Sequence, residues 1–312
     1  MIFWRPFSLL IKKFGLYEIY FINEIRVYCS VKQPSFLVHY NTNKLDMPGL
    51  CQIIRRHNPM KIACISDMHL GAEKRCDGFH HEEDVFLHFL DYLEHHYDLI
   101  VLNGDIYDTR KSKAFHIPMD QLMLVKERYK QLSERFSQSN YKQIAGNHDY
   151  ILKDLGCPTH YSVQDEDGMD YIFTHGHQFD KVETGGKFPI AVTWLVGWLE
   201  RLGWKNADSY LAWAQGITSS FFQKTNIETL RMGAMEMLAK SNVAAVVMGH
   251  THETPVRMDM GDKIYMNSGS CSKKRLQYVH LDTTEKDFHT KNWCQTNRYG
   301  IAIDTSYPAL QT

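Results

Sequence analysis

The amino-acid sequence predicts an α/β fold in which short buried strands alternate with amphipathic helices. The apolar runs "KIACI", "DLIVL" and "VAAVV" are nearly uninterrupted, as expected for strands that are covered on both faces. Residues 82–96 instead repeat apolar side chains at the spacing of a helix with one buried face. The strand runs end in polar residues, and sites in open α/β sheets form outside the carboxyl ends of strands.

Each expected element follows from one of these two patterns. The helix over 82–96 has an apolar face made by Val85, Phe86, Phe89, Leu90 and Leu93. The full order is strand 61–67, helix 82–96, strand 98–105, helix 119–136, and strands 141–149, 169–177, 243–252, 263–270 and 277–282. Because strands alternate with helices in the first part, we expect layers of helix and sheet.

One main domain is expected over residues 59–290. Residues 1–58 are aromatic and prone to form strands, but they carry no motif, so we interpret them as an N-terminal extension. A helical insert near residues 185–240 separates the fourth strand from the fifth, and residues 291–312 are expected to form a C-terminal tail.

Composition and charge narrow the class of protein. The 35 basic and 36 acidic residues leave a net charge of -1, so no nucleic-acid partner is expected. The seven cysteines include no CxxC pair, which favours reduced thiols and a cytoplasmic location. No run of about 18 apolar residues occurs, so no transmembrane helix is predicted.

Side chains that can bind metal follow five of the expected strands. They are Asp67 and His69, Asp105, Asn147 and His148, His175 and His177, and His250 and His252. A single such residue is more often a cap or a turn residue, but five strand ends in series favour a site. Because every donor is oxygen or nitrogen, we expect Mn, Fe, Zn or Mg and not a thiolate zinc site.

The order of these blocks, D-x-H, G-D, G-N-H-D, H and G-H-x-H, resembles the calcineurin-like metallophosphoesterases over residues 61–282. This resemblance implies a four-layer αββα sandwich with two metal ions at the strand ends. It implies one metal held by Asp67, His69, Asp105 and His252. It implies a second metal held by Asp105, Asn147, His175 and His250. Asp105 would bridge the two metals, His148 would be the catalytic histidine, and Asp149 would orient it.

The chemistry of phosphoester hydrolysis agrees with these roles. Two divalent cations about 3.5–4 Å apart stabilise both oxygens of an in-line displacement, and a water molecule that they activate attacks phosphorus. The leaving oxygen then needs a proton or charge stabilisation, which a histidine not used for metal can supply. Manganese is the expected metal, with iron, zinc and magnesium as alternatives.

Four of the six tryptophans, Trp194, Trp198, Trp204 and Trp213, lie in the insert. One interpretation is a helical hairpin packed on the core. The other is a cap with an apolar groove, or a helix that rests on a membrane. The insert and the block "HGHQFD" resemble the UDP-2,3-diacylglucosamine pyrophosphatases, whose helical cap holds acyl chains. Two blocks differ from that branch: His148 stands where arginine is frequent, and "NSGSCSKKR" replaces an Asp-Trp type of loop.

Several residues remain open between a structural and a substrate-binding role. His177 is interpreted either as a surface histidine or as a residue above the substrate, and Trp194 and Trp198 follow the two interpretations of the insert. Lys273, Lys274 and Arg275 form a solvated face or bind a second phosphate. Asp108 and Asp180 are open in the same way, and one interpretation of Asp108, three residues after Asp105, is a residue that holds a metal ligand in place.

The leading hypothesis is a phosphohydrolase that acts on a UDP-diacylglucosamine-like nucleotide-diphosphate lipid. The first alternative is a general small-molecule phosphodiesterase or phosphoprotein phosphatase, and the second is an inactive binding scaffold with the same fold. No obligate protein partner is expected. Peripheral contact with the inner face of a membrane through the tryptophan-rich insert is part of the leading hypothesis.

Overall fold

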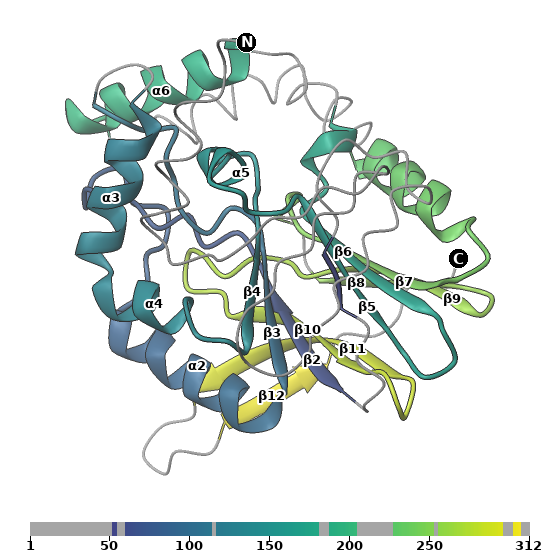
Figure 1. Cartoon of the computed structure of the whole chain (residues 1–312). Helices are drawn as coiled ribbons and strands as arrows, with labels where there is room; N and C mark the ends of the chain where they lie inside the picture. Colours follow the sequence, from purple (N-terminus) through teal and green to yellow (C-terminus); the bar gives the residue numbers. More distant parts are fainter. Residues whose placement is uncertain are drawn as a thin grey trace, which may run out of the picture. The chain divides into compact units, whose positions relative to one another are not determined.

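The computed structural model describes residues 52–54, 60–113, 117–180, 187–204, 227–252, 255–295 and 302–306. The chain divides into two units, Met1–Pro48 and Gly49–Thr312, and every described residue belongs to the second. Most of the predicted extension over 1–58 therefore lies outside the described residues, as do Trp213 and much of the insert. The described part contains two six-stranded sheets with helices beside them (Figure 1).

Sheet B has the strand order β12-β11-β10-β2-β3-β4. Its strands are β2 (Lys61–Ile65), β3 (Leu99–Asn103), β4 (Tyr141–Ile144), β10 (Gln277–Asp282), β11 (Asp287–Gln295) and β12 (Ala302–Ser306). The predicted strands β2, β3 and β4 are parallel neighbours, whereas β10 to β12 are antiparallel. Because parallel strands end at the same edge, the polar residues after β2, β3 and β4 are brought together.

Sheet A has the strand order β1-β5-β6-β7-β9-β8. Its strands are β1 (Gln52–Ile54), β5 (His160–Gln164), β6 (Asp170–Thr174), β7 (Val243–Met248), β8 (Val256–Met260) and β9 (Lys263–Asn267). The strands β6, β7 and β9 are parallel. The side chain of Asn103, at the end of β3, donates to the carbonyl of Thr174, at the end of β6, over 3.0 Å. The polar ends of the two sheets therefore meet.

Apolar side chains fill the spaces between four layers. One buried cluster lies between the sheets and includes Cys64, Val101 and Phe173. Another lies between sheet B and the helices α2 (Glu83–His96), α3 (Pro118–Arg128) and α4 (Lys130–Arg135) (Figure 1). Helical residues 227–238 pack on sheet A, where Leu230 and Leu238 are buried. The predicted order of helix, sheet, sheet and helix is confirmed.

Two expected elements have different limits in the structure. The helix predicted over 119–136 is two helices, because Tyr129 between them has non-helical φ and ψ values of -107° and 53°. Its hydroxyl donates to Asp77, so Tyr129 is held away from a continuous helix. The expected tail over 291–312 begins inside β11 and includes β12, and β1 lies before residue 59, so both sheets extend past the predicted domain limits.

The remaining described helices are α5 (Ile151–Asp154), the 3-10 turn η1 (His177–Phe179) and α6 (Lys187–Arg201) in the insert. None of the described helices combines the length and the apolar character that a membrane crossing requires.

Candidate metal centre

The backbone at the strand ends adopts a conformation that ordinary residues avoid. Five of the seven predicted ligands have positive φ angles: Asp67 (55°), His69 (52°), Asp105 (54°), His250 (70°) and His252 (52°). A left-handed backbone costs a residue with a side chain roughly 1–3 kcal/mol, and it persists only where the surrounding structure imposes it. Strain concentrated at these strand ends indicates a site whose geometry was retained at the expense of local stability.

Two glycines of the motifs make this close approach possible. Gly104, in "NGD", has a φ of 85°, and a Cβ atom there would lie 2.6 Å from the ring of His175. Gly146, in "GNHD", faces Asp105, and a Cβ atom there would lie 2.2 Å from Oδ1. A larger residue at either position would push apart two of the predicted ligands.

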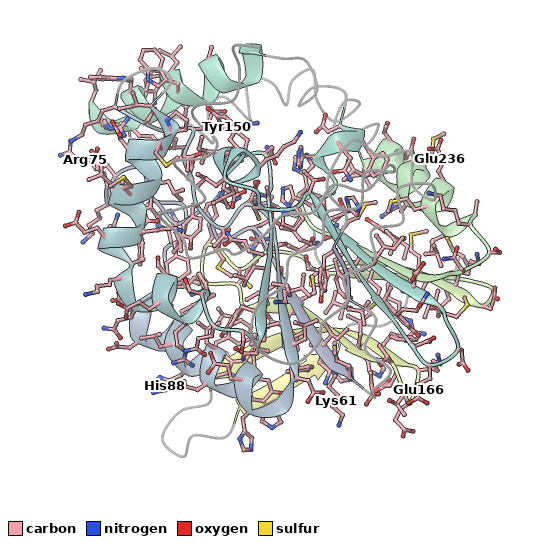
Figure 2. The ribbon with its side chains drawn as sticks, viewed as in Figure 1. Lys61, Arg75, His88, Tyr150, Glu166 and Glu236 are labelled. Carbon is pink, nitrogen blue, oxygen red and sulfur yellow. The ribbon has the colours of Figure 1, made fainter. Side chains whose placement is uncertain are left out.

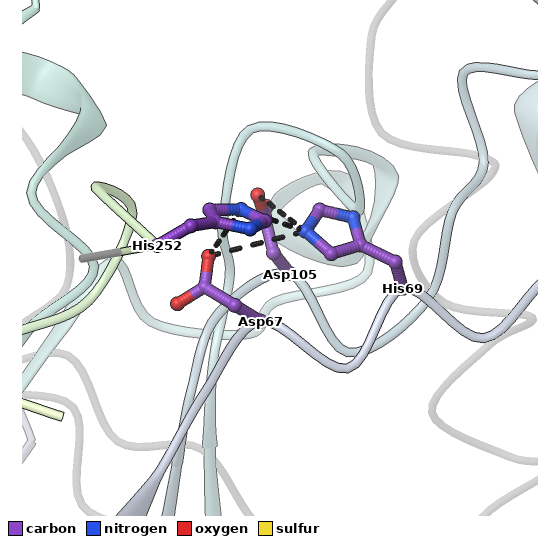
Figure 3. A group of neighbouring side chains, drawn as sticks. All are labelled: Asp67, His69, Asp105 and His252. Carbon is purple, nitrogen blue, oxygen red and sulfur yellow. Dashed lines mark hydrogen bonds and ion pairs between the residues drawn. The ribbon is translucent and has the colours of Figure 1, made fainter. Parts of the chain in front are cut away.

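The first group of side chains contains Asp67, His69, Asp105 and His252, whose ligand atoms all lie within 4.8 Å of one another (Figure 3). The Nε2 atoms of His69 and His252 are 3.0 Å apart. Oδ1 of Asp67 lies 3.1 Å from Nε2 of His252, and Oδ2 of Asp105 lies 4.0 Å from Nε2 of His69. The first predicted ligand set is therefore brought together.

The second group contains Asp105, His175 and His250, again within 4.8 Å. Nε2 of His175 lies 3.2 Å from Oδ2 of Asp105 and 3.0 Å from Oδ1 of Asn147. Its other ring nitrogen, Nδ1, lies 2.8 Å from the backbone carbonyl oxygen of Asn103, which fixes the ring. Asp105 belongs to both groups, so the structure places it where a bridging ligand would have to lie.

The electrostatics of the two groups favour cations. Burial raises the pKa of a carboxyl group, yet the neighbouring histidines hold the pKa of Asp67 and of Asp105 below its usual range. Burial, followed by the charges of His148 and His252, lowers the pKa of His69 to about 3, so its ring is neutral and able to bind metal. Burial opposes a charge on His175, but Asp105 raises the pKa of that ring to about 10.

One buried atom tests whether these residues suit a metal ion. Oδ1 of Asp67 is buried, and the described groups near it are Nε2 of His252, at 3.1 Å, and Nε2 of His69, at 4.0 Å, neither in hydrogen-bond geometry. An oxygen in that state is costly unless a cation or a donor approaches it. Two imidazole nitrogens only 3.0 Å apart present a similar problem, because both carry lone pairs unless one is protonated. The donors of both groups therefore fit divalent cations.

The carboxylate beside His148 is Asp108 and not Asp149, so the expected orienting role of Asp149 is wrong. Nδ1 of His148 lies 3.3 Å from Oδ1 of Asp108. Asp149 instead accepts the backbone N–H groups of Gly146 and Ile106, at 2.6 Å and 2.8 Å. Gly146 follows β4 and Ile106 follows β3, so Asp149 joins the ends of the two strands.

The backbone of His148 also organises the site. Its N–H donates to Oδ1 of Asp105 over 2.7 Å, which leaves Oδ2 facing the histidines. Its ring makes an edge contact with His69 at 4.6 Å and is 20% exposed. Burial lowers the pKa of His148, but the negative charges of Asp105 and Asp108 raise it by more than burial lowers it. The pKa of His148 therefore lies above its usual value. His69, Asp108 and His148 also form a third close group.

The predicted substrate-binding residues separate into those near the two groups and those farther away. The ring of His177 lies 5.5 Å from His175 and 6.4 Å from His250, beside the second group. Arg275 reaches the first group, since its Nη1 donates to the backbone oxygen of His252 over 3.0 Å. The side chains of Lys273 and Lys274 are exposed.

The helix α6 carries Trp194 and Trp198, whose rings meet edge to face at 6.4 Å. Nε1 of Trp198 donates to the backbone oxygen of Lys113 over 2.8 Å. Arg75 donates to the carbonyl of Arg201, so one end of α6 is fixed to the loop after β2 (Figure 2). Trp198 therefore contacts the loop after β3, and Trp194 packs against Trp198.

Buried charges connect α6 with the environment of His148. Nζ of Lys111 lies 3.2 Å from Glu200, on α6, and 4.0 Å from Asp108. Lys111 and Glu200 are both more than nine-tenths buried. Neither residue was identified from the sequence. Glu200 lies in the insert, where the tryptophans were the only signal considered, and Lys111 follows the motif "GDIYD" without being part of it.

Arg110 and Asp180 also lie beside the centre. Arg110 is buried, and its positive charge opposes protonation of His148 and His177. Oδ2 of Asp180 lies 3.1 Å from Nε2 of His250. The sequence marked Asp180 only as an acidic residue after the fourth strand, and it gave no signal for Arg110.

Five strand ends, two sheets and one shared carboxylate thus define a candidate two-metal site of the phosphoesterase type. The comparison with protein families agrees, since residues 60–254 match the calcineurin-like phosphoesterases. The chain belongs to the calcineurin-like phosphoesterase family.

Solved structures show weaker similarities. A predicted phosphoesterase from Streptococcus pneumoniae TIGR4 is 16% identical, with a TM-score of 0.39, over 80% of this chain and 99% of that chain. Zinc-bound Vps29 from Entamoeba histolytica is 13% identical, with a TM-score of 0.37, over 79% and 99%. A dimetal phosphatase from Danio rerio is 11% identical, with a TM-score of 0.39, over 80% and 100%. The comparison with curated proteins gave no match. Family membership therefore rests on residues 60–254.

Proposed function

We propose that this protein is a phosphohydrolase that depends on two divalent cations. The observation that carries the proposal is the position of Asp105, which is shared by two groups of metal-binding side chains from both sheets. Asp67, His69 and His252 would complete one metal site, and Asn147, His175 and His250 the other. When bound, the two cations activate a water molecule and neutralise charge on the phosphoryl oxygens.

The residues around this centre have separate tasks in the proposed reaction. Asp108 holds Nδ1 of His148, so Nε2 of the ring remains available to give a proton to the leaving oxygen. The backbone N–H of His148 fixes Asp105, and Asp149 joins the strand end that carries Asp105 to the one that carries His148. Arg110 and His177 lie beside the same centre and would contact the phosphoryl group of the substrate.

The proposed substrate is a UDP-diacylglucosamine-like nucleotide-diphosphate lipid. The support comes from α6 and the turn after it, where Leu195, Trp198 and Leu202 are exposed apolar side chains. Exposed apolar groups of this kind suit acyl chains or the surface of a membrane. We place the protein in the cytoplasm, at the inner face of the membrane, with manganese as the metal and no obligate protein partner.

A general phosphodiesterase or phosphoprotein phosphatase is the second candidate, and one observation favours it. The helix α6 is fixed by ion pairs to the loops after β2 and β3, as a helix with a purely structural role would be. An inactive binding scaffold is the third candidate. It is disfavoured because all seven predicted ligands and His148 are present.

The test is Mn²⁺-dependent hydrolysis of UDP-2,3-diacylglucosamine beside UDP-N-acetylglucosamine, with a chromogenic phosphodiester as a control for the metal centre. We expect strong preference for the acylated substrate. Hydrolysis of the diester alone would overturn the lipid substrate and leave the metal chemistry in place. Failure to hydrolyse any of the three would favour the scaffold.

A further inference from the structure

A chain of buried hydroxyl groups lies behind Asp67. Ser66 donates from Oγ to Oδ2 of Asp67. The Oγ atoms of Ser66 and Ser268 are 2.7 Å apart, although the two residues are 202 positions apart in the sequence. All three side chains are fully buried. If a substitution removed one of these hydroxyl groups, bulk water could not take over its hydrogen bond, because the site is closed to solvent.

The direction of these hydrogen bonds follows from the groups involved. A carboxylate only accepts, so the single hydrogen of the Ser66 hydroxyl points at Asp67. Ser66 must then accept in its contact with Ser268, which makes Ser268 the donor. The backbone carbonyl of Met248 already accepts the N–H of Ser268 at 2.9 Å, and the hydroxyl lies farther from that carbonyl, at 3.2 Å. Ser66 is the nearer acceptor for the hydroxyl of Ser268.

These bonds make the two carboxylate oxygens of Asp67 unequal. Oδ2 receives the Ser66 hydroxyl and the backbone N–H of His250, the latter over 3.1 Å. Oδ1 accepts no hydrogen bond from the described residues and faces His252. A carboxylate held in this way by one oxygen cannot rotate to offer both oxygens equally to a cation.

The hydroxyl pair also joins the two sheets. Ser66 follows β2 of sheet B, whereas Ser268 follows β9 of sheet A. Ser270, in the same loop, donates to the backbone oxygen of Asp67 over 3.1 Å. Ser268 and Ser270 therefore support Asp67 from the opposite sheet.

We propose that Ser66 and Ser268 are positioning residues of the metal centre, whose linked hydroxyls hold Oδ2 of Asp67 and present Oδ1 to a divalent cation. This inference rests on the two-metal centre proposed above. It assigns Ser268, in the block "NSGSCS", a task in metal binding, although Ser268 is not a predicted ligand.

The test is calorimetric titration of Mn²⁺ into the full-length apoprotein, with Ser66→Ala, Ser268→Ala and the double variant. Loss of an outer partner of a ligand typically costs about 10–100-fold in metal affinity. We expect that loss in one of two binding events, while the other keeps its Kd. The double variant should bind no more weakly than Ser66→Ala, because the two hydroxyls act in series.

Ser272→Ala is the matched control. Its hydroxyl lies in the same buried loop and contacts Ser270 at 2.8 Å, one step farther from Asp67. Its Mn²⁺ affinity should equal that of the wild type. If Ser66→Ala does not fold, Ser268→Ala carries the test, because its side chain touches no predicted ligand.

The outcomes separate this inference from the proposed function. Two wild-type binding events that both serine variants retain unchanged would overturn the inference alone. Equal weakening of both events, shared by Ser272→Ala, would show a general effect of the loop and would also overturn it. A wild-type protein that binds no Mn²⁺ would overturn the metal centre and this inference together.

Discussion

The strand-end centre and helix α6 depart from ordinary protein surfaces in opposite ways. At the strand ends, Asp67, Asp105 and His175 are charged or polar and almost fully buried. Just after α6, Leu202 and Trp204 are apolar, yet they are 78% and 49% exposed. Buried polar groups and exposed apolar groups are the two informative exceptions to the usual distribution of residues.

The difference between the two regions is how closely each is constrained. The ligand side chains are held by strained backbone, by close-fitting glycines and by one another. On α6, by contrast, Leu195 is exposed, although the helix itself is fixed by Lys111 and Arg201. The strand ends therefore indicate a chemistry, whereas α6 bears on the substrate only through the function proposed above.

The largest expected effect is the loss of the shared ligand, by Asp105→Asn. An amide has one donor end and no charge, so it cannot bridge two cations or balance the neighbouring histidines. We expect metal content to fall and hydrolysis to drop by roughly 10³-fold or more. Metal analysis and Mn²⁺-dependent assays would measure both.

Asp120→Asn is the control for Asp105→Asn, because Asp120 is an exposed acid on α3. It should keep the metal content and the rate of the wild type. If Asp105→Asn still bound two metals, the bridging role would be lost from the proposal.

The next largest effect is expected for His148→Ala, which should keep both metals and lose turnover by roughly 10²–10⁴-fold. The loss should be larger for a phenyl phosphodiester than for its p-nitrophenyl analogue, because p-nitrophenolate leaves without a proton. Rates with both esters, beside metal analysis of the same samples, would measure this. Lower metal content would instead make His148 a ligand, with His69 and Asp108.

The contrast between regions also explains what the sequence could predict. The grouping of the candidate ligands was predictable because each follows a buried strand within a few residues, and parallel strands bring such ends together. The carboxylate that contacts His148 was not predictable, because neighbours in sequence need not be neighbours in space. Asp149 is adjacent to His148 but turns toward the amides of Gly146 and Ile106, while Asp108 comes from another strand end.

Long-range support for the centre was harder still to predict. Ser268 reaches Asp67 through Ser66 across the two sheets, and Glu200 reaches Asp108 through Lys111. Each link needs the relative position of two elements that no local pattern contains. The predicted domain limits, 59–290, leave out β1 and β12 for a related reason. Both are edge strands, and whether an edge strand forms depends on a partner strand elsewhere in the chain.

The smallest expected effect concerns α6 and decides whether its exposed apolar surface has a function. Leu202→Ser should raise KM for the acylated substrate by about 3- to 10-fold, because burying a leucine against an apolar ligand is worth up to about 1.5–3 kcal/mol. The rate with the chromogenic diester should not change, since that ester has no acyl chain for Leu202 to contact. Met123→Ser is the matched control, because Met123 is 64% exposed on α3. Equal KM values for both variants and the wild type would make α6 a structural helix, and the substrate would then have to be sought among small phosphodiesters and phosphoproteins.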